Sequence, residues 1–158
     1  MKASINQIED FIKEKSFLFY GISSSKGKFG NSVLKHLNDN GYDVVPIHPE
    51  IKQVLGIDCF SNPSDVNRQI TSAIVILSPE NTERVVRELI DNGIKKIWIQ
   101  QRSESENAVN MCKENGIEVI TGECILMYTE PVTVIHNIHK IINKVIGKYP
   151  AKEKMVSD

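Results

Sequence analysis

Residues 19–37 read FYGISSSKGKFGNSVLKHL, a hydrophobic run followed by a loop of glycine, serine and lysine and then by a helical pattern. The hydrophobic run begins upstream, and SFLFYGI (Ser16–Ile22) is short and apolar, as expected for a buried strand. Apolar residues then recur at helical spacing over Asn31–Asn40, and Gly41 marks the expected end of this helix. A strand, a glycine-rich loop and a helix in direct succession indicate an α/β domain.

The same alternation of strand and helix continues along the chain. Four further apolar segments predict strands at Tyr42–Ile47, Ser72–Leu77, Lys95–Gln100 and Ile117–Ile120. Helices are predicted at 4–15, where Ser4 and Gln7 form a capping-box signature, and at Pro79–Asn92 and Glu104–Asn115. Segment 50–68 is harder to interpret, although GIDCFSNPSDV is compatible with a short strand and a helical turn. Short buried strands that alternate with helices pair in parallel, which predicts a doubly wound sheet of about five strands.

Length and composition predict one domain. The chain has 158 residues, of which 41% are apolar and 25% are charged, as is usual for a globular protein. We assign residues 1–149 to a single domain and residues 150–158 to a flexible tail. The last predicted helix, Val132–Ile146, carries apolar residues around most of its surface, so it is expected to pack on the sheet or to form a homodimer.

Charge and cysteine content exclude several classes of protein. Nineteen basic and twenty acidic residues give a net charge of -1, which does not favour nucleic acid or an anionic membrane as a partner. We find neither a signal peptide nor an apolar run near the ~20 residues that span a bilayer. Three cysteines without CxxC spacing indicate reduced thiols, so we expect a cytoplasmic protein. His136 and His139 lack an evident third ligand, and no metal site is expected.

The loop between the first strand and its helix is the candidate site. Ligands of parallel α/β sheets bind beyond the carboxyl ends of the strands, where this loop lies. Its glycines bring backbone close to a phosphate, and its hydroxyls, its lysines and the N–H groups of the helix attract an anion. The candidate binding residues here are Gly21, Ser23, Ser24, Ser25, Lys26, Gly27, Lys28, Phe29, Gly30 and Asn31. The alternative is a flexible turn with solvated lysines.

The end of the second strand bears on the kind of anion. NAD-binding folds place Asp or Glu there to hold the ribose hydroxyls. This chain has His48 and, after Pro49 and Glu50, a lysine at Lys52. Cations in this region suit a ribose phosphate better than a free diol, which argues against NAD and leaves NADP open. An ordinary exposed histidine and lysine are the alternative.

Four stretches resemble, in content and order, the small stand-alone CoA-binding domain proteins. They are GISSSKGKFGNSV, GYDVVPIHPE, GIKKIWIQQ and GIEVITGECILM, and the similarity runs from about Ser16 to Met127. That family is related to the N-terminal domain of the succinyl-CoA synthetase alpha subunit. The resemblance implies a Rossmann-like fold, expected here with the strand order 3-2-1-4-5, and CoA lying across the strand ends.

Site residues follow from the resemblance by position. The Gly21–Asn31 loop would hold the pyrophosphate, and His48 and Lys52 would lie near the ribose phosphate. The remaining candidates at the strand ends are Leu77, Ser78, Pro79, Gln100 and Cys124, of which the first three would border the adenosine. The family commonly has asparagine in place of His48, and Gln-Pro-Gly where this chain has residues 100–102 as Gln-Gln-Arg, so details of the ligand are expected to differ.

The function expected from these residues is the binding of CoA or an acyl-CoA without ligase chemistry. The synthetase acts through a phosphohistidine in a second domain and through a partner subunit, and from the resemblance we expect no such domain within these 158 residues. One alternative is a small NAD(P)-dependent oxidoreductase, with His48, Cys124 and Tyr128 as candidates for proton transfer. Cys124 has apolar neighbours, which predicts a raised thiol pKa. Another alternative is a dimeric interaction protein with a vestigial nucleotide site.

Overall fold

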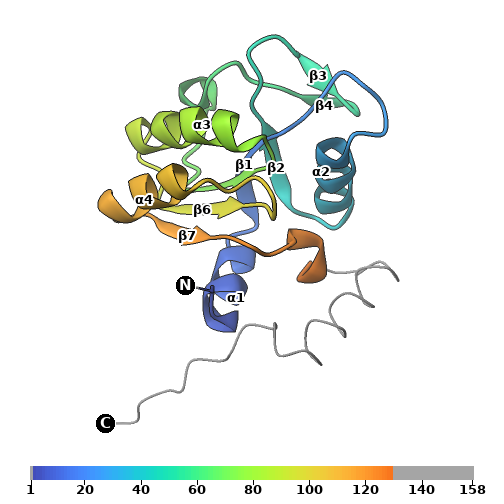
Figure 1. The fold of residues 1–158 in the computed structure, drawn as a ribbon. Coiled ribbons are helices and arrows are strands. Elements are labelled where there is room, and N and C mark those ends of the chain that lie inside the picture. Colours follow the sequence, from blue (N-terminus) through green and yellow to red (C-terminus); the bar gives the residue numbers. More distant parts are fainter. Residues whose placement is uncertain (1, 130–158) are drawn as a thin grey trace.

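Residues 2–129 are described by the computed structural model, in which a parallel sheet lies between two pairs of helices (Figure 1). The five strands of the sheet are β1 (Ser16–Tyr20), β2 (Asp43–Pro46), β5 (Ser72–Val75), β6 (Lys96–Ile99) and β7 (Glu118–Ile120). The helices are α1 (Ile5–Lys13), α2 (Phe29–Asp39), α3 (Pro79–Asp91) and α4 (Glu106–Glu114). The predicted helix at 132–146, its suggested role in a dimer, and the tail at 150–158 lie outside the described residues.

Both faces of the sheet are buried because its strands are apolar on both sides. In β1, Phe17 and Phe19 pack towards α1 and α2, whereas Leu18 and Tyr20 pack towards α3 and α4. Figure 1 shows the same division, with α3 and α4 together on one side of the sheet and α1 and α2 on the other. Strands with two buried faces give continuous hydrophobic segments, which explains why they could be located in the sequence.

Small elements fill the connection between β2 and β5. An antiparallel hairpin consists of β3 (Gln53–Val54) and β4 (Ile57–Asp58), and a short 3₁₀ helix follows at Pro63–Asp65. The short strand and helical turn suggested for this segment are therefore present. Beside the outer edge of β2 there is one parallel bridge, between Ile47 and Phe60.

The predicted α/β class with five parallel strands is confirmed, but the predicted order was wrong in one position. The sheet has the order β2-β1-β5-β6-β7, which reads 2-1-3-4-5 when its strands are counted along the chain, instead of 3-2-1-4-5. The third strand, β5, pairs with β1 and not with the outer edge of β2. The reason is the connection after β2, where the hairpin and the single bridge at Phe60 occupy the place of an outer strand.

The start of the first helix agrees with the sequence in detail. The hydroxyl of Ser4 accepts a hydrogen bond from the N–H of Gln7 at 3.2 Å, and the Gln7 side chain accepts one from the N–H of Ser4 at 2.8 Å. This pair is the predicted capping box. It fixes where α1 begins against the sheet.

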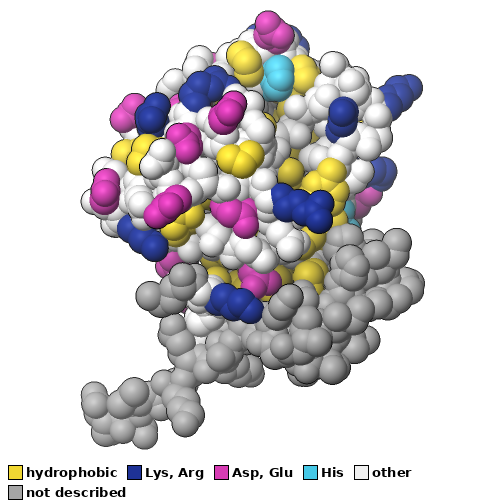
Figure 2. Space-filling model, viewed as in Figure 1, with side chains coloured by type: hydrophobic (Ala, Val, Ile, Leu, Met, Phe, Trp, Pro, Cys, Tyr) yellow, Lys and Arg dark blue, Asp and Glu magenta, His cyan; other side chains and the backbone are white. Residues whose placement is uncertain are grey.

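The described surface has mixed charge. Figure 2 shows acidic and basic side chains interspersed over the α3 and α4 side of the molecule, in keeping with the net charge of -1. Within residues 2–129, no helix is long and apolar enough to cross a membrane. The same part of the chain has no group of three or more His, Cys, Asp and Glu residues that could hold a metal ion.

Candidate functional site

Two glycines hold the first turn of α2 directly against the end of β1. A Cβ atom on Gly30 would overlap the carbonyl oxygen of Gly21, and a Cβ atom on Gly21 would overlap the carbonyl oxygen of Ile76. Gly21 also has a φ of +133°, a conformation that side chains disfavour. The backbones of β1, α2 and the end of β5 are therefore in contact without intervening side chains. This close packing places the start of α2 at the carboxyl edge of the sheet.

Asn31 organises the loop between these glycines. Its side-chain oxygen accepts a hydrogen bond from the N–H of Ser23 at 2.9 Å, and its amide nitrogen donates to the carbonyl oxygens of Ser23 at 2.8 Å and Ser25 at 3.4 Å. The hydroxyl of Ser23 in turn accepts from the N–H of Ser25 at 3.1 Å. Asn31 is buried. The side chain predicted to contact a ligand is thus used inside the loop, which it holds in one conformation.

The start of α2 presents unpaired donors. Lys28, the residue that precedes the helix, makes no capping hydrogen bond with its side chain. Among the described residues, the backbone N–H groups of Phe29, Gly30 and Asn31 have no acceptor. These groups and the positive end of the helix dipole form an anion-binding position. Lys26 and Lys28 are exposed beside it, and neither forms an ion pair within residues 2–129.

One groove, called here the α2 groove, lies between this loop and the β3–β4 hairpin. It has a volume of about 570 Å³. The loop contributes Ser24, Lys26 and Gly27, whereas the hairpin side contributes Gln53 and the apolar side chains of Ile51, Val54 and Leu55. Leu55, at the tip of the hairpin, is 55% exposed and has a φ of +53°. An exposed leucine in a left-handed conformation is unusual, and it forms part of the apolar wall.

A second groove, called here the α3 groove, lies between α3 and the segments that follow β2 and β4. It has a volume of about 360 Å³. Gly21, His48 and Leu77 line it at the carboxyl ends of β1, β2 and β5, so it begins where the loop begins. Further residues from α3 line its side, namely Asn81, Arg84, Val85 and Glu88. The α3 groove includes Gly21 and Ile22 and the α2 groove includes Ser23 and Ser24, so the two grooves lie along consecutive parts of the same loop.

His48 stabilises the turn between the grooves. Its Nδ1 atom accepts hydrogen bonds from the N–H groups of Glu50 and Ile51, both at 3.1 Å. Because Nδ1 is an acceptor, the proton of the neutral ring is on Nε2, which can donate. Lys52 donates to the hydroxyl of Ser61 at 3.0 Å, and Ser61 lines the α3 groove. Both residues predicted near a ribose phosphate thus lie at or beside the α3 groove.

Leu77, Ser78 and Pro79 form the start of α3 at the same edge. Leu77 lines the α3 groove. Ser78 is the N-cap residue, whose hydroxyl accepts a hydrogen bond from the Asn81 side chain at 3.0 Å, and Pro79 is the first helical residue. Of these three, only Leu77 is among the residues that line the groove.

Gln100 and Cys124 do not line either groove. The side-chain oxygen of buried Gln100 accepts from the N–H of Ile125 at 3.2 Å, which joins the end of β6 to the short 3₁₀ helix at Ile125–Met127. Cys124 is half-buried beside it. Burial raises the pKa of the Cys124 thiol, in the direction predicted from its apolar neighbours.

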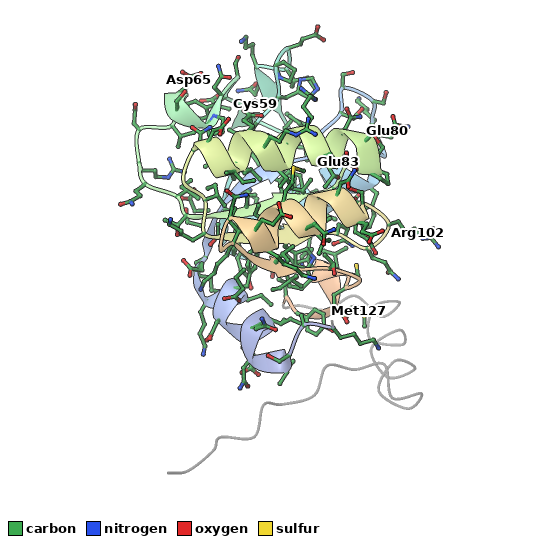
Figure 3. The ribbon with its side chains drawn as sticks, turned by 60° about the vertical axis from the view of Figure 1, so that its left-hand side comes forward. Cys59, Asp65, Glu80, Glu83, Arg102 and Met127 are labelled. Carbon is green, nitrogen blue, oxygen red and sulfur yellow. The ribbon has the colours of Figure 1, made fainter. Side chains whose placement is uncertain are left out.

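Arg102 differs from its surroundings in backbone conformation. It follows β6 with a φ of +75°, which costs a residue other than glycine about 1 kcal/mol. The resembled family commonly has glycine here, and glycine adopts this conformation freely. Figure 3 shows the Arg102 side chain extending outwards on the same side of the molecule as Glu80, which lies in the first turn of α3. The carboxyl edge therefore carries an exposed cation at position 102.

Several residues of the two grooves were not predicted. The hairpin side of the α2 groove was missed because strands of two residues give no sequence pattern. On α3, the positions 81, 84, 85 and 88 share one helical face, and this spacing was a signal that could have been used. Tyr20, the last residue of β1, also lines the α3 groove and was assigned only to the strand.

Comparison with known proteins gives a consistent set of relatives. A family model described as CoA binding domain matches residues 15–130. The protein YneT of Bacillus subtilis, described as uncharacterized, is 29% identical over 124 residues, which cover 78% of this chain and 90% of YneT. A hypothetical protein from Pyrococcus horikoshii OT3 has a solved structure with a TM-score of 0.68 and 26% identity, over 79% of this chain and 92% of that one.

A much longer protein also matches. An ADP-forming acetate–CoA ligase of Methanocaldococcus jannaschii is 29% identical over 140 residues, which cover 87% of this chain. The match covers 20% of the ligase, so this chain corresponds to about a fifth of that enzyme's length.

Proposed function

The chain belongs to the CoA-binding domain family, and from this membership we propose that it binds CoA or an acyl-CoA at the carboxyl edge of its sheet without ligase chemistry of its own. The observation that carries the proposal is the loop fixed by Asn31, whose adjoining helix presents unpaired N–H groups. Such a position suits the pyrophosphate of CoA. The match to a small part of a ligase supports binding without transferring the ligase's reaction.

The α3 groove suits the adenosine half of the ligand. It opens beside the proposed pyrophosphate position, and Leu77 and Val85 give it apolar walls. Its rim carries donors for a phosphate on the ribose, from the Nε2 atom of His48, from Arg84, and from Lys52 through its position beside Ser61. NAD lacks this phosphate, so the rim favours CoA or NADP over NAD.

CoA is expected to stabilise the protein more than NAD or NADP. A ligand present at ~100 times its dissociation constant adds about 2.7 kcal/mol to the free energy of unfolding. For a domain of this size the melting temperature rises by roughly 5 to 10 °C. A thermal scan with the three ligands at equal concentration measures this, and dephospho-CoA, which lacks the ribose phosphate, should give a smaller rise. A larger rise with NADP and none with CoA would contradict the proposal.

The bound thioester is expected to be held without being cleaved. Cleavage would need an activated nucleophile, and the raised pKa of Cys124 keeps its thiol protonated near neutral pH. Release of free thiol from acetyl-CoA should therefore not exceed the rate in buffer. Turnover above that rate that disappears in Cys124→Ser would show that the protein is an enzyme, and Cys112→Ser, at a thiol on the buried face of α4, is the control.

The oxidoreductase alternative gains no support from the geometry of its candidates. Nδ1 of His48 accepts two backbone hydrogen bonds, and the hydroxyl of Tyr128 donates to Glu123 at 2.7 Å. Cys124 has a raised pKa and does not line a groove. The hydrogen bonds described here for His48 and Tyr128 therefore go to other groups and do not join two of the three candidates.

A further inference from the structure

The turn between β3 and β4 holds a leucine in an unfavourable conformation. Leu55 has a φ of +53° and Gly56 a φ of +76°, so both central residues of this two-residue turn are left-handed, as in a type I′ hairpin turn. Asn, Asp or Gly is usual at the first of these positions, because a leucine is strained there. Leu55 is also 55% exposed, so burial in the core does not explain its presence. A strained and exposed apolar residue is a reason to look for a role in binding.

Leu55 belongs to the apolar lining of the α2 groove. Ile51 and Val54 line the same groove, and both also pack against the core, which anchors this part of the lining. Figure 1 shows the hairpin next to α2, which contributes Ser32 and Lys35 to the groove. The volume of about 570 Å³ lies within the range of small-molecule pockets, which is roughly 300–1,000 Å³. The groove therefore has room for a small molecule with an apolar part.

The polar lining of the α2 groove suits an anion. Lys26 and Lys35 both line it, and Lys26 forms no ion pair within residues 2–129, whereas Lys35 is paired with Asp39. Ser23 and Ser24 line it from the loop that precedes α2, beside the unpaired N–H groups at the start of that helix. Positive charge and apolar surface thus occur in one groove. This combination is complementary to a ligand that carries both a phosphate and an apolar chain.

The covalent structure of an acyl-CoA indicates which part of it faces this groove. Its pyrophosphate joins the adenosine on one side to the pantetheine arm on the other, and the acyl group is at the far end of that arm. The proposed function has the adenosine in the α3 groove, which is lined by Gly21 and Ile22. The next loop residues, Ser23 and Ser24, line the α2 groove. The half of the ligand that carries the acyl group is therefore directed towards the α2 groove.

We propose that the α2 groove binds the acyl group of an acyl-CoA and that its hairpin selects apolar chains longer than acetyl. This inference rests on the proposed function, since it takes the positions of the pyrophosphate and the adenosine from it. Methylene groups of the chain are removed from water against Ile51, Val54 and Leu55. Burial of each methylene stabilises the complex through the hydrophobic effect. The strained leucine is retained because it supplies apolar surface that asparagine or glycine would not.

The test measures affinity against chain length, by isothermal titration calorimetry with CoA, acetyl-CoA, butyryl-CoA and hexanoyl-CoA. Each added methylene is expected to raise the affinity about two- to fourfold, so hexanoyl-CoA should bind at least about tenfold more tightly than acetyl-CoA. An affinity that is the same for all four compounds overturns the inference while the proposed function stands. Absence of binding by all four overturns the proposed function and the inference together.

Leu55→Asn provides a second, independent measurement. It removes the apolar side chain and introduces a residue that suits a left-handed turn position, so the preference for hexanoyl-CoA over acetyl-CoA should fall at least about threefold. The melting temperature of the free protein should stay the same or rise. Lys15→Asn is the matched control, because Lys15 is also left-handed, with a φ of +59°, but precedes β1 at the opposite edge of the sheet. It should keep the preference.

Two results with Leu55→Asn contradict the inference. An unchanged preference for hexanoyl-CoA would show that Leu55 does not contact the chain. A marked fall in the melting temperature of the free protein would show that the leucine is retained for stability and not for binding.

Discussion

Replacement of Gly30 by valine is expected to lower the free energy of unfolding by about 3 kcal/mol and to abolish CoA binding. Any Cβ atom at this position overlaps the carbonyl oxygen of Gly21, so helix and strand must separate. Gly21 cannot move away because its own backbone lies against Ile76. The branched valine side chain then keeps the unpaired N–H groups of α2 away from the phosphate. Urea unfolding and calorimetric titration with CoA measure the two effects.

Two neighbouring variants are the controls for this prediction. Gly27→Ala introduces a Cβ atom into open space. Only the strain of an alanine at a φ of +78° is then expected, which lowers the free energy of unfolding by about 1 kcal/mol. Lys26→Ala should leave the melting of the free protein nearly unchanged and weaken CoA binding, because it removes an exposed charge. If Gly30→Val and Gly27→Ala lost equal stability, the close contact with Gly21 would not be what requires glycine.

Replacement of Asn31 by alanine is expected to lower the affinity for CoA by about 10- to 100-fold. The change removes all the hydrogen bonds between this side chain and the backbone of Ser23 and Ser25, so the loop loses the conformation that presents its donors. Ordering the loop on binding then has an entropic cost, which reduces the net free energy of binding. Calorimetric titration measures the affinity, and thermal melting shows how much stability is lost at the same time.

Asn31→Asp tests whether geometry or charge matters more. Aspartate can still accept from the N–H of Ser23, but it loses both donated hydrogen bonds and adds a negative charge beside the proposed pyrophosphate. We therefore expect a larger loss of affinity than in Asn31→Ala. Asn38→Ala, at an exposed position near the end of the same helix, is the control. Wild-type affinity in Asn31→Ala would show that the loop needs no such support.

The sequence predicts local structure well here because each strand is a continuous apolar segment and because the helix ends carry recognisable residues. Gly41, for example, follows a helix whose apolar spacing is regular, and Ser4 with Gln7 fixes the start of another helix. Strand order depends instead on which strand pairs with which. The position of β5 beside β1 is decided by a connection that contains two-residue strands and a three-residue 3₁₀ helix, and such short segments carry no periodicity.

The candidate site likewise has features that could be inferred from the sequence and features that could not. The close approach of Gly21 and Gly30 could be inferred because a strand, a loop and a helix follow one another directly. The role of Asn31 could not be inferred from the sequence, since it depends on how the loop folds so that its carbonyl groups face this side chain. Tyr20 and Glu88 are far apart in the sequence and meet only because α3 packs over the end of β1. No spacing rule connects such a pair.

The hairpin between β2 and β5 has a consequence for the rate of ligand exchange. An isolated two-stranded hairpin is at best marginally stable, and this one is joined to the sheet by the bridge at Ile47 and Phe60. Residues 50–62 can therefore open by local unfolding while the five-stranded sheet stays intact. Because residues of this segment line both the α2 groove and the α3 groove, its opening would loosen the contacts of a bound molecule in both grooves at once. We therefore expect the residence time of the proposed ligand to depend on how firmly this hairpin packs on the domain, through its hydrogen bonds and through Val54 and Ile57, which contact the core.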